Sequence, residues 1–201
     1  MEKIDICNNA LVEAHIDSTI TNMNESSPEA ERFRRIYDPT RRELLSMYPW
    51  GFANKFVKLS RAYEDVEGYD YAYKYPSEAL RINDIYINEL AYKKRDHIKF
   101  DMADAKVSYV NNNKCIVCNY KEPFVSMNVD VTREDLFPPH FVRLFYLMMA
   151  LKIAKMSGAG QNIISEINDS ISTQFSFSST ISNREESEGK DFFNYYVDVR
   201  S

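Results

Sequence analysis

Apolar residues recur at helical spacing in the first quarter of the chain. The first such set is Ile4, Cys7, Leu11 and Ala14. It predicts an amphipathic helix over residues 4–15. A second helix is predicted to begin at Ser27, because a serine hydroxyl caps free backbone amides and Pro28 fits the first helical position. Pro39 lies inside this second pattern and predicts a kink or break near Asp38, and Pro49 is expected to end the helix.

The period of the pattern changes after Trp50, where short runs rich in β-branched and aromatic residues begin. The runs cover residues 52–59, 69–75, 80–87, 97–102, 106–110, 115–120 and 124–131. Asn111-Asn112-Asn113 separates two of them and predicts a hairpin turn, because asparagine tolerates positive φ. The middle third therefore predicts an antiparallel β module of about five to seven strands.

Helical spacing returns at Pro138 and predicts a buried helix to about Met156, which Ser157–Gly160 ends. A further helix is predicted with Ile164, Ile167 and Ile171 on one face. The segment 183–190 is charged and is expected to be flexible.

These elements predict an α+β fold with segregated helices and strands. Residues 1–49 and 132–182 are expected to form an antiparallel helical bundle, and residues 50–131 an inserted antiparallel β module. Residues 183–201 are expected to form an extended C-terminal tail.

The charge balance changes the range of partners to consider. The chain has 201 residues, with 25 basic and 30 acidic side chains, a net charge of −5 that argues against a general nucleic-acid-binding surface. No targeting segment is visible at the amino terminus. The odd count of three cysteines then favours free thiols in a reducing cytoplasm.

Two sets of residues invite a chemical interpretation that their context does not support. Cys115-x-x-Cys118 lies in a strand pattern, whereas a redox pair opens a helix and a zinc site needs two more ligands at comparable spacing. The carboxylate pairs Asp101/Asp104 and Glu134/Asp135 lie in polar turns without a nearby histidine. We therefore expect no catalytic residue, no metal site and no cofactor.

Arginines gather in the second predicted helix: Arg32, Arg34, Arg35, Arg41 and Arg42. Such a run is usually the solvated side of an amphipathic helix. The alternative is contact with an acidic patch on a neighbouring protein, because the guanidinium fork pairs well with carboxylates. Arg34, Arg35, Arg41 and Arg42 are therefore candidate partner contacts.

Two apolar features suggest contact with other chains. The helix over 141–154 is apolar nearly all round, and Phe145, Tyr146, Met148 and Met149 would suit an oligomer interface. The chain end carries Phe192, Phe193, Tyr195, Tyr196 and Val197, too few residues for a core and too apolar for a free end. Such an end docks on its own domain or on a partner.

Several motifs, taken in order over roughly residues 4–160, resemble the head-to-tail adaptor (tail tubular protein A) family of short-tailed bacteriophages. They are the segments 7–12, 27–31, 37–45, 48–53, 71–82 and 129–132, followed by Leu136-Phe-Pro-Pro139 and an apolar helix.

The resemblance implies a structural protein of the virion, made in the cytoplasm of a bacterial host. In the family, twelve copies form a ring beneath the portal protein of the capsid, with the helical part facing the portal and the β part facing the tail nozzle protein. The carboxy-terminal segment reaches onto the portal, and packaged DNA passes through the bore without specific binding.

Two alternatives remain open from the residues alone. One is a hydrolytic enzyme that uses Asp101, Asp104, Glu122 and Asp130 of the β module. The other is a small cytosolic binding module whose tail docks on its own domain.

Overall fold

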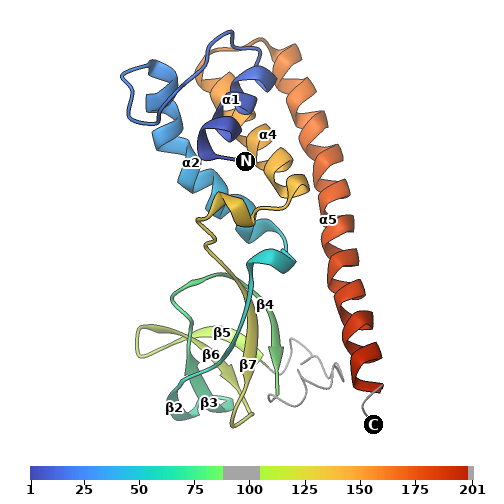
Figure 1. Ribbon diagram of the computed structural model, residues 1–201. Helices are drawn as coiled ribbons and strands as arrows, with labels where there is room; N and C mark the ends of the chain where they lie inside the picture. Colours follow the sequence, from blue (N-terminus) through green and yellow to red (C-terminus); the bar gives the residue numbers. More distant parts are fainter. Residues whose placement is uncertain (88–104, 199–201) are drawn as a thin grey trace. The chain divides into compact units, whose positions relative to one another are not determined.

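The chain folds into two compact units, one made from both ends of the chain and one from its middle. The computed structural model describes residues 1–87 and 105–198. In the second range, side chains are described up to residue 183. The first unit consists of Met1–Phe52 and Val131–Ser201, and the second of Ala53–Asp130 (Figure 1). Helices make up most of the first unit and antiparallel strands most of the second, so the fold belongs to the α+β class.

Helices α1 (Lys3–Glu13) and α2 (Pro28–Met47) begin the first unit. As predicted, the Ser27 hydroxyl caps α2, accepting from the Ala30 backbone N–H at 3.2 Å. Of the two alternatives predicted near Asp38, a kink or a break, the break is wrong, because α2 continues through Pro39. The buried residues Tyr37 and Leu44, on either side of the proline, hold α2 against the core across the point where one backbone hydrogen bond is lost. The helix ends at Met47, where Tyr48 takes the extended backbone that a following proline favours.

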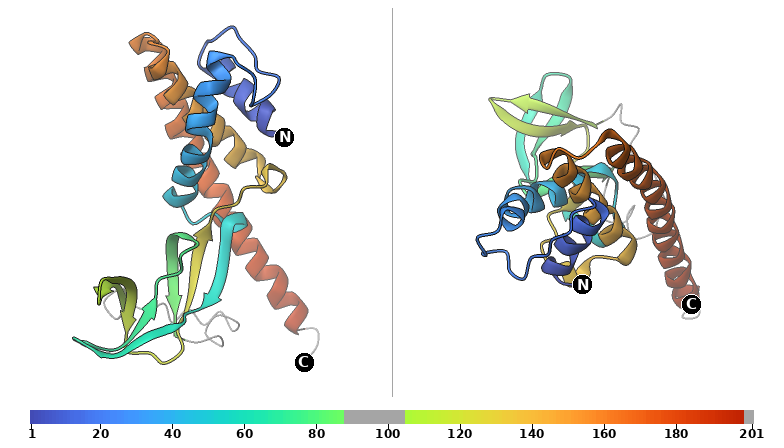
Figure 2. Two further views of the ribbon diagram at one scale, coloured as in Figure 1. Left: turned by 90° about the vertical axis from the view of Figure 1, so that its left-hand side faces the viewer. Right: turned by 90° about the horizontal axis from the view of Figure 1, so that it is seen from above.

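Helix α4 (Pro139–Met156) is the central helix of this unit. It packs against α1, α2 and α5 of its own chain (Figure 2). Packing within one subunit therefore already covers most of its apolar surface, and the use of this helix in an oligomer stays a prediction. Phe145, Met148 and Met149 are buried core residues within one subunit, and Tyr146 is half-buried.

Helix α5 (Gln161–Asp198) follows after a turn at Ser157–Gly160, in which Gly158 has a φ of 73°. The prediction of an extended tail is wrong, because the backbone is helical without interruption to Asp198 (Figure 1), and the flexibility expected over 183–190 stays a prediction. The sequence from Arg184 to Lys190 is rich in arginine, glutamate and lysine. These residues are compatible with a solvent-exposed helix as well as with a solvent-exposed coil.

The described residues of the second unit form two antiparallel sheets. Their strands are β1 (Asn54–Lys58), β2 (Arg61–Val66), β3 (Tyr69–Lys74), β4 (Ala79–Tyr86), β5 (Ala105–Val110), β6 (Asn113–Cys118) and β7 (Phe124–Val129). One sheet has the order β1-β7-β4 and the other β2-β3-β6-β5. Strand β2 was not predicted, because Glu64 and Asp65 interrupt its apolar alternation. The strand predicted over 97–102 lies outside the described residues.

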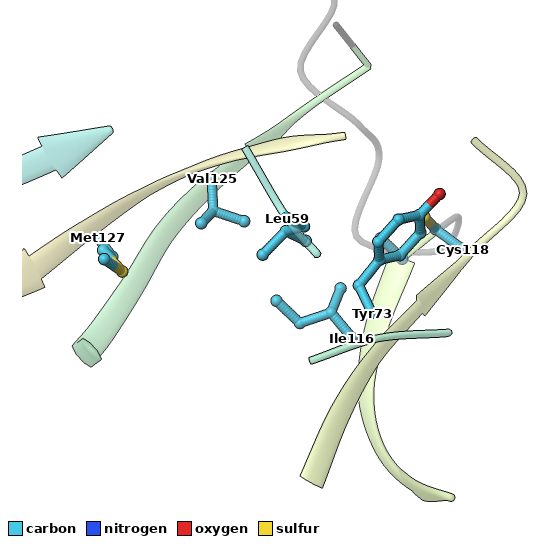
Figure 3. Packing of buried hydrophobic residues seen from close by; sticks show 7 residues of the cluster. Leu59, Tyr73, Ile116, Cys118, Val125 and Met127 are labelled. Atoms are coloured by element: carbon cyan, nitrogen blue, oxygen red, sulfur yellow. The ribbon is translucent and has the colours of Figure 1, made fainter. Parts of the chain in front are cut away.

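Side chains from both sheets form one apolar cluster. Val125 and Met127 of β7 meet Tyr73 of β3 and Ile116 of β6, with Leu59 between them (Figure 3). The predicted hairpin at Asn111-Asn112 is confirmed, because both residues have positive φ, at 49° and 62°. The turn pairs Val110 with Asn113 across β5 and β6.

Candidate interaction surfaces

Small polar residues hold α5 against the rest of the helical unit. Along its buried side, Ile167 gives way to Gln174, Ser178 and Ser182. The Gln174 amide and the Ser178 hydroxyl both donate to the His140 carbonyl oxygen, at 3.1 and 3.0 Å. The Gly51 backbone N–H donates to the Ser182 hydroxyl at 3.4 Å. These bonds satisfy polar groups that burial would otherwise penalise, and they fix α5 as far as Ser182.

An apolar groove lies where α2, α4 and α5 meet. Its volume is about 430 Å³. The apolar lining residues are Met47 of α2, Leu144, Met148 and Leu151 of α4, and Ile171 and Phe175 of α5. The Phe175 ring also packs edge-on against Tyr48, with centroids 6.1 Å apart, which fixes one wall. We refer to this feature as the apolar groove.

Charged residues border the apolar groove at one side. Glu43 and Lys152 both lie on its lining, and the Lys152 ammonium is 2.5 Å from a Glu43 carboxylate oxygen. Met47 remains 44% exposed at the groove although it is a large apolar side chain. The site therefore offers an open apolar surface with a polar margin, an arrangement that suits an apolar segment of another chain better than a free small molecule.

A second hollow, of about 880 Å³, lies on the other flank of α5 and is polar. Arg143 of α4 lines it together with Glu166, Asp169 and Thr173 of α5, and the half-exposed Phe177 lies at one end. Its polar lining, of mixed charge, separates it in character from the apolar groove.

The candidate arginines of α2 have partners inside their own chain. Arg34 donates to the Met23 and Glu25 carbonyl oxygens, at 2.6 and 3.1 Å, and so anchors the loop before α2. Arg35 pairs with Glu31, and Arg41, which is buried, lies 2.5 Å from Asp38.

Arg42 is exposed on the same face of α2 as Glu31 and Asp38. Acidic and basic residues therefore alternate on this face, and the arginines do not gather into one basic surface. Their contact with a partner stays a prediction.

The aromatic residues of the chain end fall on the last turns of α5. The positions of Phe192, Phe193, Tyr195, Tyr196 and Val197 are helical, and their side chains lie outside the described part of the chain.

The paired cysteines of β6 point into different clusters. Cys115 packs with Ala72 and Val117, whereas Cys118 packs with Tyr73 and Ile116 on the other face of the strand. The two sulfurs therefore do not share one coordination site. Burial raises the pKa of the Cys118 thiol and brings that of Cys7 to about 12, which keeps both thiols protonated and unreactive. The described residues contain no group of metal-ligating side chains.

The acids considered for hydrolysis are not brought together where the structure describes them. Glu122 precedes β7 and pairs with Lys58 at 2.9 Å, which lowers the pKa of this carboxyl. Asp130 follows the other end of this six-residue strand, about 20 Å away. Asp101 and Asp104 lie outside the described residues. Glu134 accepts a hydrogen bond from the Tyr37 hydroxyl at 3.0 Å, and Asp135 pairs with Arg133.

Sequence reasoning missed the apolar groove. It named Met148 as part of an all-round apolar helix and Ile171 on the apolar face of the following helix, but it did not single out Met47 or Phe175. The available signal was a second apolar row on α5, since Phe175 follows Ile171 by four positions.

Among the helices that the structure describes, none combines the length and the hydropathy needed to span a membrane.

No family model matches the chain, and no curated protein matches it.

Proposed function

We propose that this chain is a structural head-to-tail adaptor of a short-tailed phage virion, which forms a ring joining the portal to the tail nozzle and lines the DNA channel. The two partners, the portal and the tail nozzle, are those implied by the resemblance of roughly residues 4–160 to the head-to-tail adaptor family. The finer architecture proposed with it is an antiparallel helical bundle that carries an inserted β module and contacts the portal. In this proposal the chain connects the portal to the tail nozzle and catalyses no reaction.

The observation that carries the proposal is the continuation of α5. This helix has 38 residues and a length of about 57 Å. Its described hydrogen bonds to the 48–51 turn end at Asn183, whose side chain accepts from the Tyr48 hydroxyl at 2.5 Å. A further fifteen residues of helix follow, and the sequence there is aromatic. A long terminal helix with an apolar end is suited to reach another subunit.

The charge of the two units fits a DNA conduit. Residues 1–52 and 131–201 carry 18 acidic and 13 basic side chains, whereas residues 53–130 carry 12 of each. A bore lined by net negative charge repels the phosphate backbone, so DNA would slide through it without being retained.

The proposal is tested with the full chain and the cognate portal. We expect the two to co-sediment at micromolar concentration and moderate salt, and negative-stain images to show stacked rings. A monomer in the absence of portal agrees with the proposal, because a ring of this kind can assemble on its partner. Failure to bind the portal under these conditions would contradict it.

A further inference from the structure

We propose that the terminal turns of α5 of one copy dock in the apolar groove of a second copy of this chain. The residues concerned are Phe192, Phe193, Tyr195, Tyr196 and Val197 on one side and the groove around Met47, Met148 and Phe175 on the other. The inference rests on the proposed ring and names the contact between neighbouring subunits.

The geometry of α5 prevents the same contact within one chain. The groove uses α5 residues from Asn168 to Phe175, and Phe192 lies seventeen positions further along the same uninterrupted helix. At 1.5 Å per residue this separation is about 26 Å along the helix axis. The terminal turns therefore cannot return to their own groove while α5 remains helical, and an occupant of this kind comes from another chain.

Side-chain chemistry matches the two surfaces. The terminal segment supplies aromatic and β-branched residues. Met47 and Met148 line the groove, and methionine adapts its shape to aromatic rings and makes favourable sulfur–ring contacts. Docking over Met47 would bury one of the large apolar side chains that the isolated subunit exposes to solvent.

Charge favours the same pairing. Helix α4 carries Arg143, Lys152 and Lys155 and no acidic residue, although at the groove itself Lys152 is paired with Glu43. Residues 184–198 of α5 carry five acidic side chains and two basic ones. An acidic segment beside a basic helix gains long-range attraction and a preferred orientation.

The proposed contact between copies is heterologous, meaning that it joins two different surfaces of the subunit. The groove and the terminal turns are different surfaces of one subunit, so each copy uses one to bind the next and the other to be bound. Contacts of this heterologous kind generate rings when the rotation between subunits closes, and filaments when it does not.

Site-directed disulfide trapping tests the pairing. One batch of full-length protein carries Met47→Cys and a second batch carries Tyr196→Cys, and the two are mixed under mild oxidation, free and with the portal. We expect a disulfide-linked pair containing one copy of each. The native thiols do not interfere, because Cys7, Cys115 and Cys118 are buried.

Two control variants define the specificity of the trap. Asn194→Cys lies on the same helical segment but about 200° around the helix from position 196, and Val12→Cys lies on α1, where the side chain is 71% exposed. Asn194→Cys mixed with Met47→Cys, and Val12→Cys mixed with Tyr196→Cys, should cross-link at most one-tenth as much as the Met47→Cys and Tyr196→Cys pair. Equal cross-linking by the controls would overturn the inference.

A charge placed in the groove provides an independent measurement. Met47→Glu should weaken association between copies at least tenfold, measured by sedimentation velocity of the free protein or by occupancy of the portal-bound ring. Met156→Glu is the matched control, because Met156 is 45% exposed and lies outside the groove. Unfolding curves for both variants establish that they fold.

The outcomes separate this inference from the proposed function. Trapping between copies together with no portal binding would support the groove contact and contradict the adaptor function. Portal binding without trapping, or trapping of Tyr196→Cys on the portal alone, would support the adaptor and overturn the groove contact. Association that Met47→Glu and Met156→Glu leave equally strong would also overturn it.

Discussion

Tyr37 joins α2 to the segment that enters α4. Its ring lies edge-on to Phe145 with centroids 5.0 Å apart, and its hydroxyl donates to Glu134 at 3.0 Å. Burial and the Glu134 carboxylate raise the pKa of Tyr37, so the hydroxyl stays a proton donor. Tyr37→Phe keeps the ring packing and removes the hydrogen bond, which should lower the free energy of unfolding by about 1 kcal/mol. Urea denaturation followed by circular dichroism measures this change.

Tyr109→Phe is the control for this substitution. Tyr109 is 72% exposed in β5, so removing its hydroxyl should leave the unfolding midpoint unchanged. A Tyr37→Phe midpoint equal to that of the wild type would show that the bond to Glu134 contributes nothing.

Glu25 orders the loop before α2 and gives it a pH dependence. Its carboxylate accepts from the Ser27 hydroxyl and from the Thr21 backbone N–H and hydroxyl, which lowers its pKa to about 2 from an ordinary 4.5. A carboxyl with a lowered folded-state pKa stabilises the fold above its unfolded pKa. That contribution is lost as pH falls through the window from about 4.5 to about 2.

The titration of Glu25 by NMR checks this directly, and Glu25→Gln should remove its part of the pH dependence of unfolding. A Glu25 pKa near 4.5 would contradict the described hydrogen bonds.

At the level of elements, the β5–β6 turn depends on two asparagines in the left-handed region. Asn112 has a φ of 62°. This conformation costs a β-branched residue about 1–2 kcal/mol, whereas glycine adopts it freely. Asn112→Val should therefore lower the thermal midpoint, while Asn112→Gly should keep or raise it. Differential scanning calorimetry of both variants makes the comparison, and equal losses in both would mean that side-chain contacts decide the turn.

Elements with a strong local signal were predictable from the sequence. The Ser27-Pro28 start of α2, the Pro138–Met156 helix and the asparagine turn each depend on residues close together in the chain. The continuation of α2 through Pro39 could not be predicted in this way, because it depends on Tyr37 and Leu44 being buried by other helices. The helical state of residues 183–198 was missed because a charged segment gives the same local signal for helix and for coil.

The apolar groove had no local signal either. Met47, Met148 and Phe175 come from three helices more than a hundred positions apart at the extremes. A surface of this kind exists after the helices pack, so a single sequence shows its residues only as separate apolar positions. The terminal aromatic residues, by contrast, stand out in the sequence because so short an apolar segment cannot form a core of its own.

At the scale of the whole chain, the division into two units follows from where the spacing of apolar residues changes between the helical and the strand period. The sequence pattern placed the boundaries after residues 49 and 131, and the structure divides the units after residues 52 and 130. Gly51–Ala53 forms a single 3₁₀ turn that ends the helical unit, and the aromatic residues Trp50 and Phe52 belong to its core. A helical unit built from both chain ends closes around α4, which explains why most of its apolar surface is covered within one subunit.

The net charge of the whole chain makes a prediction about DNA. A protein binds a duplex in proportion to the phosphates that its lysines and arginines neutralise, and here acidic residues exceed basic ones by five. The full chain should therefore leave the electrophoretic mobility of duplex DNA unchanged at physiological salt and pass through a heparin column unretained. The proposed portal-bound ring should behave in the same way, since a channel that retained DNA would oppose the passage of DNA that the proposal assigns to it. Retention that falls steeply with added salt would reveal a concentrated basic surface and would exclude a non-binding bore.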